Sequence, residues 1–307
     1  MGRPQGLPEQ ARMAKSFFIL KNALLMPFQG TINSFASGVF HNGVCLPESL
    51  IEHRSSPSIL VQPTRKLSGT FIFGGYLFGH FGHFILESLA YLHIIRQCGN
   101  YPILYMSPPT GNLALNKRIF RFLGVSNEIV LVKEPTEVEN LAVGPLGSQI
   151  HPPFFSDAQV TALGVFPTSG ISPSNEKIWL SRSNYTFGGL ENEKEIEKTL
   201  AEWGWKIVHP EDLPLSEQVR LVSTAACVAG LDGSAFYSAL LADKVHGRFV
   251  VFSRRNHMPP ILELALSKKT GALQTFVPPL TYVSGTWPDL VHRLDDLEDV
   301  LGVLRGL

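Results

Sequence analysis

At 307 residues the chain is long enough for two domains, each with its own hydrophobic core. Hydrophobic residues make up 44% of the sequence and charged residues 17%, a balance that excludes a disordered chain. Lysine plus arginine equals aspartate plus glutamate at 26 each, so no net field attracts nucleic acid, and a nucleic-acid partner is not expected.

The cysteines and the N-terminal segment bear on the compartment. Cys45, Cys98 and Cys227 are odd in number, far apart and without a CxxC pair, which predicts neither a disulfide framework nor a zinc knuckle and favours a reducing, cytoplasmic location. Lysines interrupt the apolar runs at 16–20 and 23–28 well before the length of a membrane-spanning helix. We therefore expect a solvated leader, with no signal peptide and no transmembrane helix.

The first half of the chain predicts strands and helices in irregular alternation. Aromatic and apolar residues at 69–78 predict a buried strand, and apolar residues at helical spacing predict a helix over 80–97. Shorter patterns predict a strand, a helix and a strand at 101–106, 117–123 and 128–132. The segment 151–176 is rich in proline, serine and glycine, which favours an interdomain connection.

The second half alternates regularly, with strands that begin near residues 177, 205, 226, 248 and 273 and helices over 192–203, 216–224, 234–241 and 259–267. This rhythm requires right-handed crossovers and therefore a parallel, Rossmann-like sheet. The tail from Trp287 to Leu307 predicts an amphipathic helix that could cross back onto the first lobe.

Ligands of a doubly wound sheet bind beyond the carboxyl ends of its strands, so the loops there are candidate sites. The turn GLDGSAF at 230–236 lies between a predicted strand and a helix. Its glycines permit a sharp turn, and the amides of the helix start, together with the Ser234 hydroxyl, suit a phosphate oxygen. A cap by Asp232 or Ser234 explains the pattern equally well.

Arginines follow two strands of the same lobe. Arg182, in LSRSNYTFGG, can hold a diphosphate through a forked contact, and Arg254 and Arg255 follow the strand RFVVFS. A surface arginine or an ion pair is the alternative for Arg182. Asn192 and Glu195 fit a simple helix start, because negative charge is favourable there.

The segment GHFGHFILES places His80, His83 and Glu87 on one predicted helical face, at i, i+3 and i+7. A histidine can accept a proton near neutral pH, and a carboxylate four residues further on can orient its ring. Metal ligation and a core or capping role stay open as alternatives, although no cysteine or further histidine cluster completes a metal site.

Three stretches in this order resemble glycosyltransferase family 61, which includes bacterial capsular polysaccharide enzymes. They are GHFGHFILESL, then IWLSRSN with the following ENEKEIEKTLAEWGWKIVHPEDLPLSEQVRLVSTA, and AGLDGSAFYSALLA. The likeness runs from about Gly74 to Val251, and its middle stretch is the most specific. One departure is Asp232-Gly233-Ser234, where many relatives carry His-Gly-Ala.

The resemblance implies an α/β fold of the GT-B type, two Rossmann-like lobes with a cleft between them. Residues 1–165 would form the acceptor-side lobe, 166–280 the donor-binding lobe and 281–307 a C-terminal helix. It further implies an inverting glycosyltransferase that uses no metal and no cofactor, with a nucleotide-sugar donor and a saccharide acceptor. Capsular or extracellular polysaccharide biosynthesis would be its setting, in peripheral association with a membrane assembly complex.

Carried onto this chain, the resemblance assigns donor phosphate to Arg182, Gly233 and Ser234, with Arg254 in support. Asp232 would repel a diphosphate, so we expect it to face ribose, sugar hydroxyls or helix amides. His83 is the expected base and Glu87 its orienting partner, with His80 as second candidate. Two alternatives stay open: a sulfo- or phosphotransferase, and a non-catalytic nucleotide- or saccharide-binding partner in polysaccharide assembly.

Overall fold

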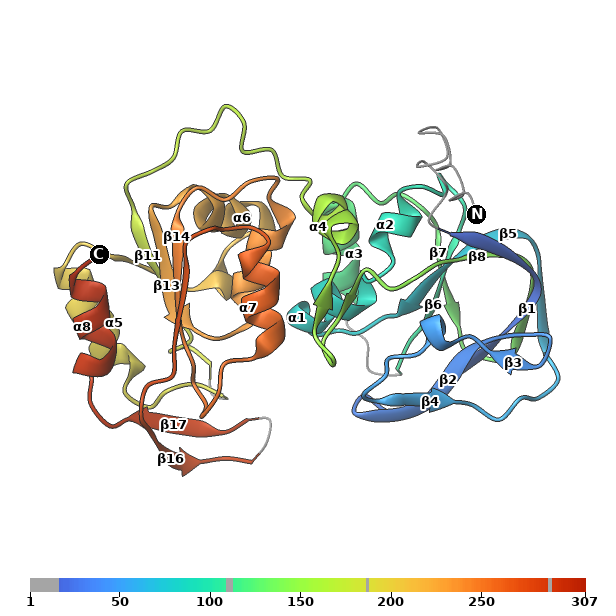
Figure 1. Cartoon of the computed structure of the whole chain (residues 1–307), viewed down its shortest axis with the longest axis horizontal. Helices are drawn as coiled ribbons and strands as arrows, with labels where there is room; N and C mark the ends of the chain where they lie inside the picture. Colours follow the sequence, from blue (N-terminus) through green and yellow to red (C-terminus); the bar gives the residue numbers. More distant parts are fainter. Residues whose placement is uncertain (1–16, 109–112, 186–187, 287–288) are drawn as a thin grey trace, which may run out of the picture. The chain divides into compact units, whose positions relative to one another are not determined.

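The computed structural model describes residues 17–108, 113–185, 188–286 and 289–307, and the N-terminal part of the expected leader lies outside them. The chain forms two compact units, each built from several stretches of sequence (Figure 1). Unit 1 comprises the chain up to Leu77 with Ser88–Gly111 and Asn127–Gly147. Unit 2 comprises Phe78–Glu87, Asn112–Ser126 and Ser148–Leu307. The candidate segment GHFGHFILE therefore lies in the same unit as most of the second half of the chain.

Unit 1 is organised around a mixed sheet with strand order β3-β2-β1-β8-β5-β6-β7, in which β4 pairs with β2. β1 is antiparallel to β2 and β8, whereas β5 is parallel to β8 and β6, and β6 to β7. The bounds are β1 Phe18–Thr31, β2 Ser34–His41, β3 Val44–Cys45, β4 Ser55–Pro57, β5 Arg65–Tyr76, β6 Ile103–Met106, β7 Ile129–Val132 and β8 Thr136–Val143. The apolar runs at 16–20 and 23–28, which are too short for a membrane-spanning helix, lie largely in the 14-residue strand β1.

The helix expected over 80–97 is broken. It consists of α1 (Phe81–His83), the π-helical turn η3 (Phe84–Ser88) and α2 (Leu92–Ile95). Two side chains that are distant in sequence donate hydrogen bonds to backbone carbonyl oxygens of the turn. The Ser148 hydroxyl donates to Leu86 O at 2.6 Å, and the Tyr105 hydroxyl donates to Ser88 O at 3.0 Å. Such insertions into the helical ladder account for the interruption.

Unit 2 contains a five-stranded sheet that is parallel throughout, with strand order β12-β11-β13-β14-β15. Its strands are β11 Lys177–Leu180, β12 Lys206–Val208, β13 Cys227–Leu231, β14 Arg248–Phe252 and β15 Leu273–Phe276. The helices between them are α5 Glu193–Glu202, α6 Leu215–Thr224, the 3-10 helix η5 Ser234–Leu241 and α7 Pro260–Ser267, with the short 3-10 turn η4 (Pro210–Asp212) after β12. The α/β, Rossmann-like interpretation of this half is confirmed, nearly element for element.

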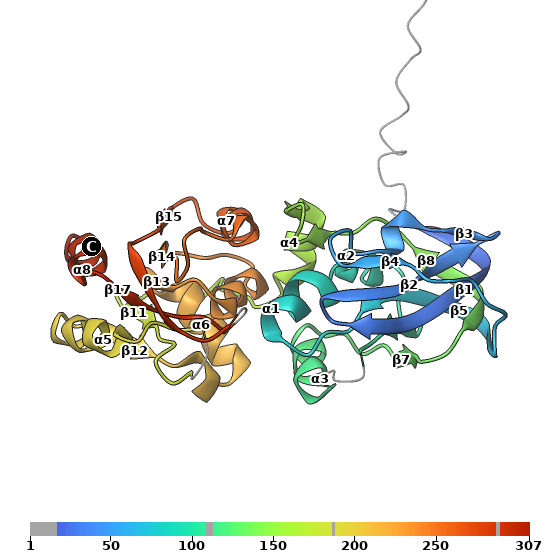
Figure 2. The ribbon, with the colours of Figure 1, turned by 90° about the horizontal axis from the view of Figure 1, so that it is seen from below.

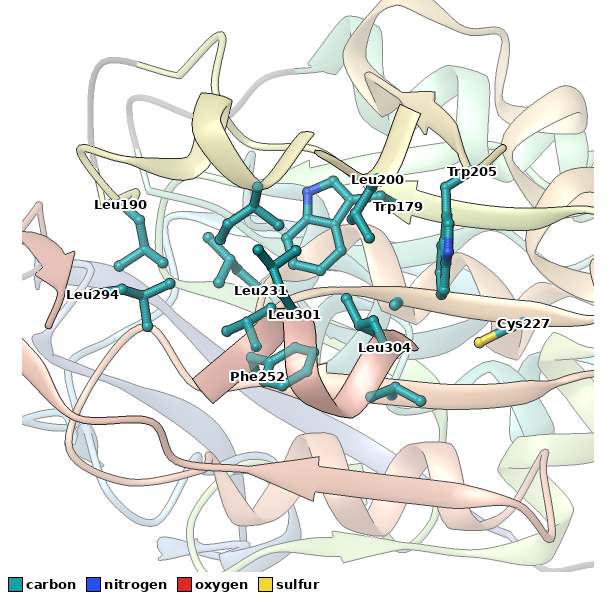
Figure 3. Packing of buried hydrophobic residues seen from close by; sticks show 14 residues of the cluster. Trp179, Leu190, Leu200, Trp205, Cys227, Leu231, Phe252, Leu294, Leu301 and Leu304 are labelled. Atoms are coloured by element: carbon teal, nitrogen blue, oxygen red, sulfur yellow. The ribbon is translucent and has the colours of Figure 1, made fainter. Parts of the chain in front are cut away.

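Alternate residues of the central strands point to opposite faces of this sheet. On one face Trp179, Leu231 and Phe252 pack against residues of α5 and of the C-terminal helix α8 (Glu298–Arg305), as Figure 3 shows. On the other face Phe249 packs against Phe236 of η5 at 6.0 Å between ring centroids. Burial on both faces explains why these strands are almost continuously apolar.

The C-terminal tail differs from the expected single helix that crosses back onto the first lobe. It forms the antiparallel hairpin β16 (Leu280–Ser284) and β17 (Val291–Leu294), followed by α8, which lies beside α5 (Figures 1 and 2). The buried residues of α8 are Val300, Leu301 and Leu304, and they belong to the core of unit 2. The apolar face of α8 is thus buried against the parallel sheet of unit 2.

The segment expected to be an interdomain connection contains some regular structure. A short hairpin, β9 (Ser148–Gln149) with β10 (Phe154–Phe155), leads into α4 (Asp157–Leu163), whose first turn is capped by the Ser156 hydroxyl accepting from Gln159 N. In unit 2, α3 (Leu113–Phe122) covers the helix expected at 117–123. Among the described residues, no helix has both the length and the apolar character needed to cross a membrane.

Candidate functional site

The strand order of unit 2 fixes where a ligand site is expected. In chain order the strands run 2-1-3-4-5, so the direction of winding changes between β11 and β13, which are adjacent and parallel. Ligands of open parallel sheets bind at such a switch point, beyond the carboxyl ends of the strands. Arg182 follows β11 there, and Asp232, Gly233 and Ser234 follow β13.

Arg182 lies directly over the turn after β13. A Cβ atom added to Gly233 would lie 2.7 Å from Arg182 Nη1, so the absence of a side chain at this position is what admits the guanidinium. Arg182 Nε is buried and has no hydrogen-bond partner among the described residues. The guanidinium carbon lies 5.2 Å from the centre of the Tyr185 ring. The arginine is therefore packed in place and keeps donor capacity.

Two further arginines converge on the same turn from the end of β14. Arg254 N donates to Asp232 Oδ1 at 2.7 Å, its Nε donates to Asp232 O at 3.0 Å, and its Nη1 donates to Gly188 O at 2.6 Å. Arg255 Nη2 lies 3.2 Å from Asp232 Oδ2. The carboxylate of Asp232 is buried and holds both arginines. It is directed at these arginines and not at the helix amides, which were one of its expected partners.

The charge balance of this cluster is positive. Burial lowers the pKa of Arg254 to about 10, and the nearby Arg182 and Arg255 add to that effect while Asp232 opposes it. Two of the three guanidinium groups, those of Arg254 and Arg255, pair with the buried carboxylate of Asp232. A cluster of this kind gains from an anionic ligand with several oxygens, because such a ligand relieves the repulsion among the arginines.

The histidine segment meets this turn within unit 2. A Cβ atom added to Gly82 would lie 3.1 Å from Ser234 Cβ and 3.5 Å from Tyr237 Cε2, so α1 lies directly against the start of η5. Desolvation, followed by nearby His83, Arg182 and Arg254, lowers the pKa of His80. His80 therefore lies on the side of the arginine cluster and favours the neutral imidazole.

His83 and Glu87 form a pair with the geometry expected of a base and its orienting group. His83 Nδ1 lies 2.6 Å from Glu87 Oε2. The Glu87 side chain is 2% exposed, whereas the His83 side chain is 37% exposed. A buried carboxylate bonded to Nδ1 favours the tautomer that carries its proton on Nδ1, so Nε2 becomes the nitrogen that accepts a proton.

The residues that hold Arg182 in place have no distinctive sequence pattern. Glu193 Oε1 accepts from Arg182 N at 2.9 Å and from Trp179 Nε1 at 3.1 Å. Burial raises the pKa of Glu193 to about 7, against the opposing effect of these hydrogen bonds. In the sequence Glu193 is simply another acidic residue near a predicted helix start, so no pattern there indicates that its side chain is buried against Arg182.

The neighbouring residues Asn192 and Glu195 lie in different environments. Asn192 is buried, and its amide group exchanges hydrogen bonds with the backbone of Leu294 in β17 at 3.2 and 3.1 Å. Glu195 is exposed on α5. Asn192 therefore fastens the C-terminal hairpin, and Glu195 is a solvated helix-start residue. Among the described residues, no group of three or more His, Cys, Asp or Glu side chains is placed to hold a metal ion.

Comparison with known proteins assigns the family. The family model described as Glycosyltransferase 61 matches residues 81–247, more than half of the chain. This range includes His83, Glu87, Arg182 and the turn at Asp232, whereas His80 and Arg254 lie just outside it. No curated protein matches the chain. From this match, the chain belongs to glycosyltransferase family 61 and is a glycosyltransferase.

Proposed function

We propose that this glycosyltransferase is an inverting, metal-independent enzyme of GT-B organisation that moves a sugar from a nucleotide diphosphate onto a saccharide acceptor. Unit 2 is the donor-binding lobe and unit 1 the acceptor-side lobe. The observation that carries the proposal is the convergence of Arg182, Arg254 and the glycine turn at a switch point. A diphosphate satisfies all of these groups at once.

The proposed catalytic base is His83. Its exposed ring and its buried carboxylate partner allow Nε2 to take a proton while Glu87 stabilises the resulting imidazolium. His80, whose pKa is lowered beside the arginines, suits a neutral hydrogen-bonding role toward the donor. The close approach of Gly82 to Ser234 keeps both histidines beside the phosphate-binding turn.

The reaction step is a direct displacement. The acceptor hydroxyl oxygen forms a bond to the anomeric carbon as the bond from that carbon to the diphosphate oxygen breaks. The hydroxyl proton moves to His83 Nε2, and the electron pair of the broken bond leaves on the nucleoside diphosphate. Attack on the face opposite the leaving group inverts the anomeric centre. Arg182, Arg254 and the amides at Ser234 meet the negative charge that a metal ion meets in other transferases.

The setting of the reaction is part of the proposal. We place the enzyme in the cytoplasm, in capsular or extracellular polysaccharide biosynthesis, in peripheral association with a membrane assembly complex. Among the described residues no disulfide joins the three cysteines, which suits a reducing compartment.

A thermal-shift screen against UDP-, GDP-, CMP- and dTDP-sugars, with and without EDTA and with PAPS as a control, tests the donor class. We expect stabilisation by one nucleotide sugar that persists in EDTA. A shift with PAPS alone, or with none of these compounds, contradicts the proposal.

The proposed role of His83 as catalytic base is tested separately. We expect His83→Ala to keep the thermal shift with the donor and to lose at least about a hundredfold in transfer rate, the lower range of general-base contributions. The exposed His246, replaced by alanine, is the matched control and keeps full activity. Transfer by His83→Ala at the wild-type rate would remove His83 from the mechanism.

A further inference from the structure

A pocket beside the phosphate-binding turn is not used by the reaction described above. It has a volume of about 220 Å³, and all of its lining residues belong to unit 2. Tyr185 and Phe81 contribute aromatic surface, and Leu213 belongs to its aliphatic lining. Pockets that take a whole drug-sized ligand measure about 300–1,000 Å³. This pocket suits one ring system better than an entire nucleotide sugar.

Two residues join the pocket to the phosphate-binding groups. Ser234 lines the pocket and is also the first residue of η5. Tyr185 lines the pocket and packs against Arg182, whose guanidinium lies over Gly233. A ligand whose phosphates bind at Arg182 and Ser234 therefore has the pocket next to its phosphate end.

The polar groups of the pocket suit a heterocycle better than a lipid or a purely apolar group. Gln218 Nε2 donates to Pro210 O at 2.6 Å and to Leu213 O at 3.0 Å, so both amide protons are committed and the carbonyl oxygen is the group left to accept. Glu211 adds a carboxylate and Arg118 a cationic donor. Aromatic surface with donors and acceptors at its edge is how proteins bind nucleobases.

We propose that this pocket receives the nucleobase of the donor nucleotide and that the ring of Tyr185 is its stacking surface. The inference rests on the proposed function, because it assumes that the diphosphate occupies the arginine cluster. It adds a specificity-determining site to that function. Tyr185 and the polar groups at the pocket edge bind the nucleobase, and Arg182, Arg254 and Ser234 bind the phosphates.

Calorimetric titration of the full chain separates the two parts of the ligand. The probes are UDP, GDP, CDP, ADP, dTDP and inorganic pyrophosphate. We expect the wild type to bind one nucleoside diphosphate more tightly than pyrophosphate. Tyr185→Ala should lower the affinity for that nucleoside diphosphate roughly 5- to 150-fold, the usual effect of losing a base stack. Tyr185→Phe, which keeps the ring, should stay within about twofold of the wild type.

A second variant controls for the contact between Tyr185 and Arg182. Leu213→Trp fills the pocket and leaves that contact unchanged. It should therefore lower the affinity for the nucleoside diphosphate and leave the affinity for pyrophosphate unchanged. Unchanged nucleoside diphosphate binding in both Tyr185→Ala and Leu213→Trp overturns the inference. Equal losses for pyrophosphate and nucleotide in both variants also overturn it. A wild type that binds none of the nucleotides overturns the proposed function, and this inference with it.

Discussion

At the scale of single residues, the position of Arg182 is set by its neighbours on α5. Glu193 accepts from its backbone amide, and Glu197 accepts from the hydroxyls of Ser181 and Ser183 on either side, at 2.5 and 3.1 Å. With the backbone fixed in this way, the guanidinium has little freedom to lose when it binds an anion. The two carboxylates are positioning residues for the arginine.

We expect Arg182→Lys to weaken donor binding roughly ten- to hundredfold, although the charge is kept. A lysine offers a single ammonium and no planar fork, so it cannot reproduce two parallel hydrogen bonds to phosphate oxygens. Donor affinity measured by calorimetry checks this. Arg220→Lys is the matched control, because Arg220 lies on the same unit in an exposed ion pair with Glu217. Equal affinities of Arg182→Lys and the wild type would remove Arg182 from the donor site.

Glu193 predicts a pH-dependent stability. Its folded-state pKa of about 7 lies above its ordinary value of 4.5, and burial is the main cause. Below pH 4.5 both folded and unfolded states hold the proton. Between 4.5 and 7 only the folded state keeps it, so rising pH lowers the free energy of unfolding, by roughly 3 kcal/mol in total. Glu193→Gln removes this loss and retains an acceptor for Arg182 N and Trp179 Nε1.

The measurement is the difference in melting temperature between Glu193→Gln and the wild type from pH 5 to pH 8. The difference should move in favour of the variant as pH rises and level off above about pH 7. Glu195→Gln, an exposed change on the same helix, should show no such trend. A trend of opposite sign would mean that the carboxylate is stabilised as an anion by its two hydrogen bonds.

At the scale of elements, the site depends on the close approach of the loops that follow the carboxyl ends of β11 and β13. Gly233 has an extended backbone, with φ −179°, so alanine costs no backbone strain there. The new methyl group would instead displace Arg182 Nη1, now 2.7 Å from that position. We expect Gly233→Ala to fold normally and to lose roughly ten- to hundredfold in kcat/KM, as small misplacements at active sites do. Gly271→Ala, with no atom near its added methyl group, is the control and should match the wild type in both assays.

The elements of unit 2 were predictable, because each buried strand and amphipathic helix carries its own local pattern. Strands β11 to β15 and the helices between them match the expected positions within a few residues. The expected positions of Arg182 and the Asp232-Gly233-Ser234 turn, at the carboxyl ends of two adjacent parallel strands, are confirmed, and their binding of the donor stays a prediction. The sequence could not indicate Glu193, whose importance comes from burial against Arg182 and Trp179.

Unit 1 was less predictable for a physical reason. Its sheet mixes antiparallel and parallel pairs, so neither simple alternation nor a repeating strand and helix rhythm marks its strands. The long strand β1 continues through Asn22, which has a positive φ, and the polar residues Lys21 and Asn22 split its apolar pattern into two runs. The broken helix at 80–97 depends on Ser148 and Tyr105, which are distant in sequence.

At the scale of the whole molecule, the two units are interleaved along the chain. Phe78–Glu87 and Asn112–Ser126 belong to unit 2, although both precede the main part of that unit by tens of residues. This interleaving brings the pair His83–Glu87 to the start of η5. The proposed catalytic site therefore cannot be obtained by cutting the chain at one position.

We therefore expect the fragment 166–307 to be less stable than the full chain and to bind the donor poorly. It lacks α1, which packs on η5 through Gly82, and α3, which contributes Leu115 and Ile119 to the pocket beside Tyr185. Their removal exposes apolar surface of η5 and α6 at a cost of about 25 cal/mol per Å². Melting temperature by circular dichroism and nucleotide affinity by calorimetry check this. A fragment that melts with the full chain and binds the nucleotide equally well would show that the parallel sheet alone makes the donor site.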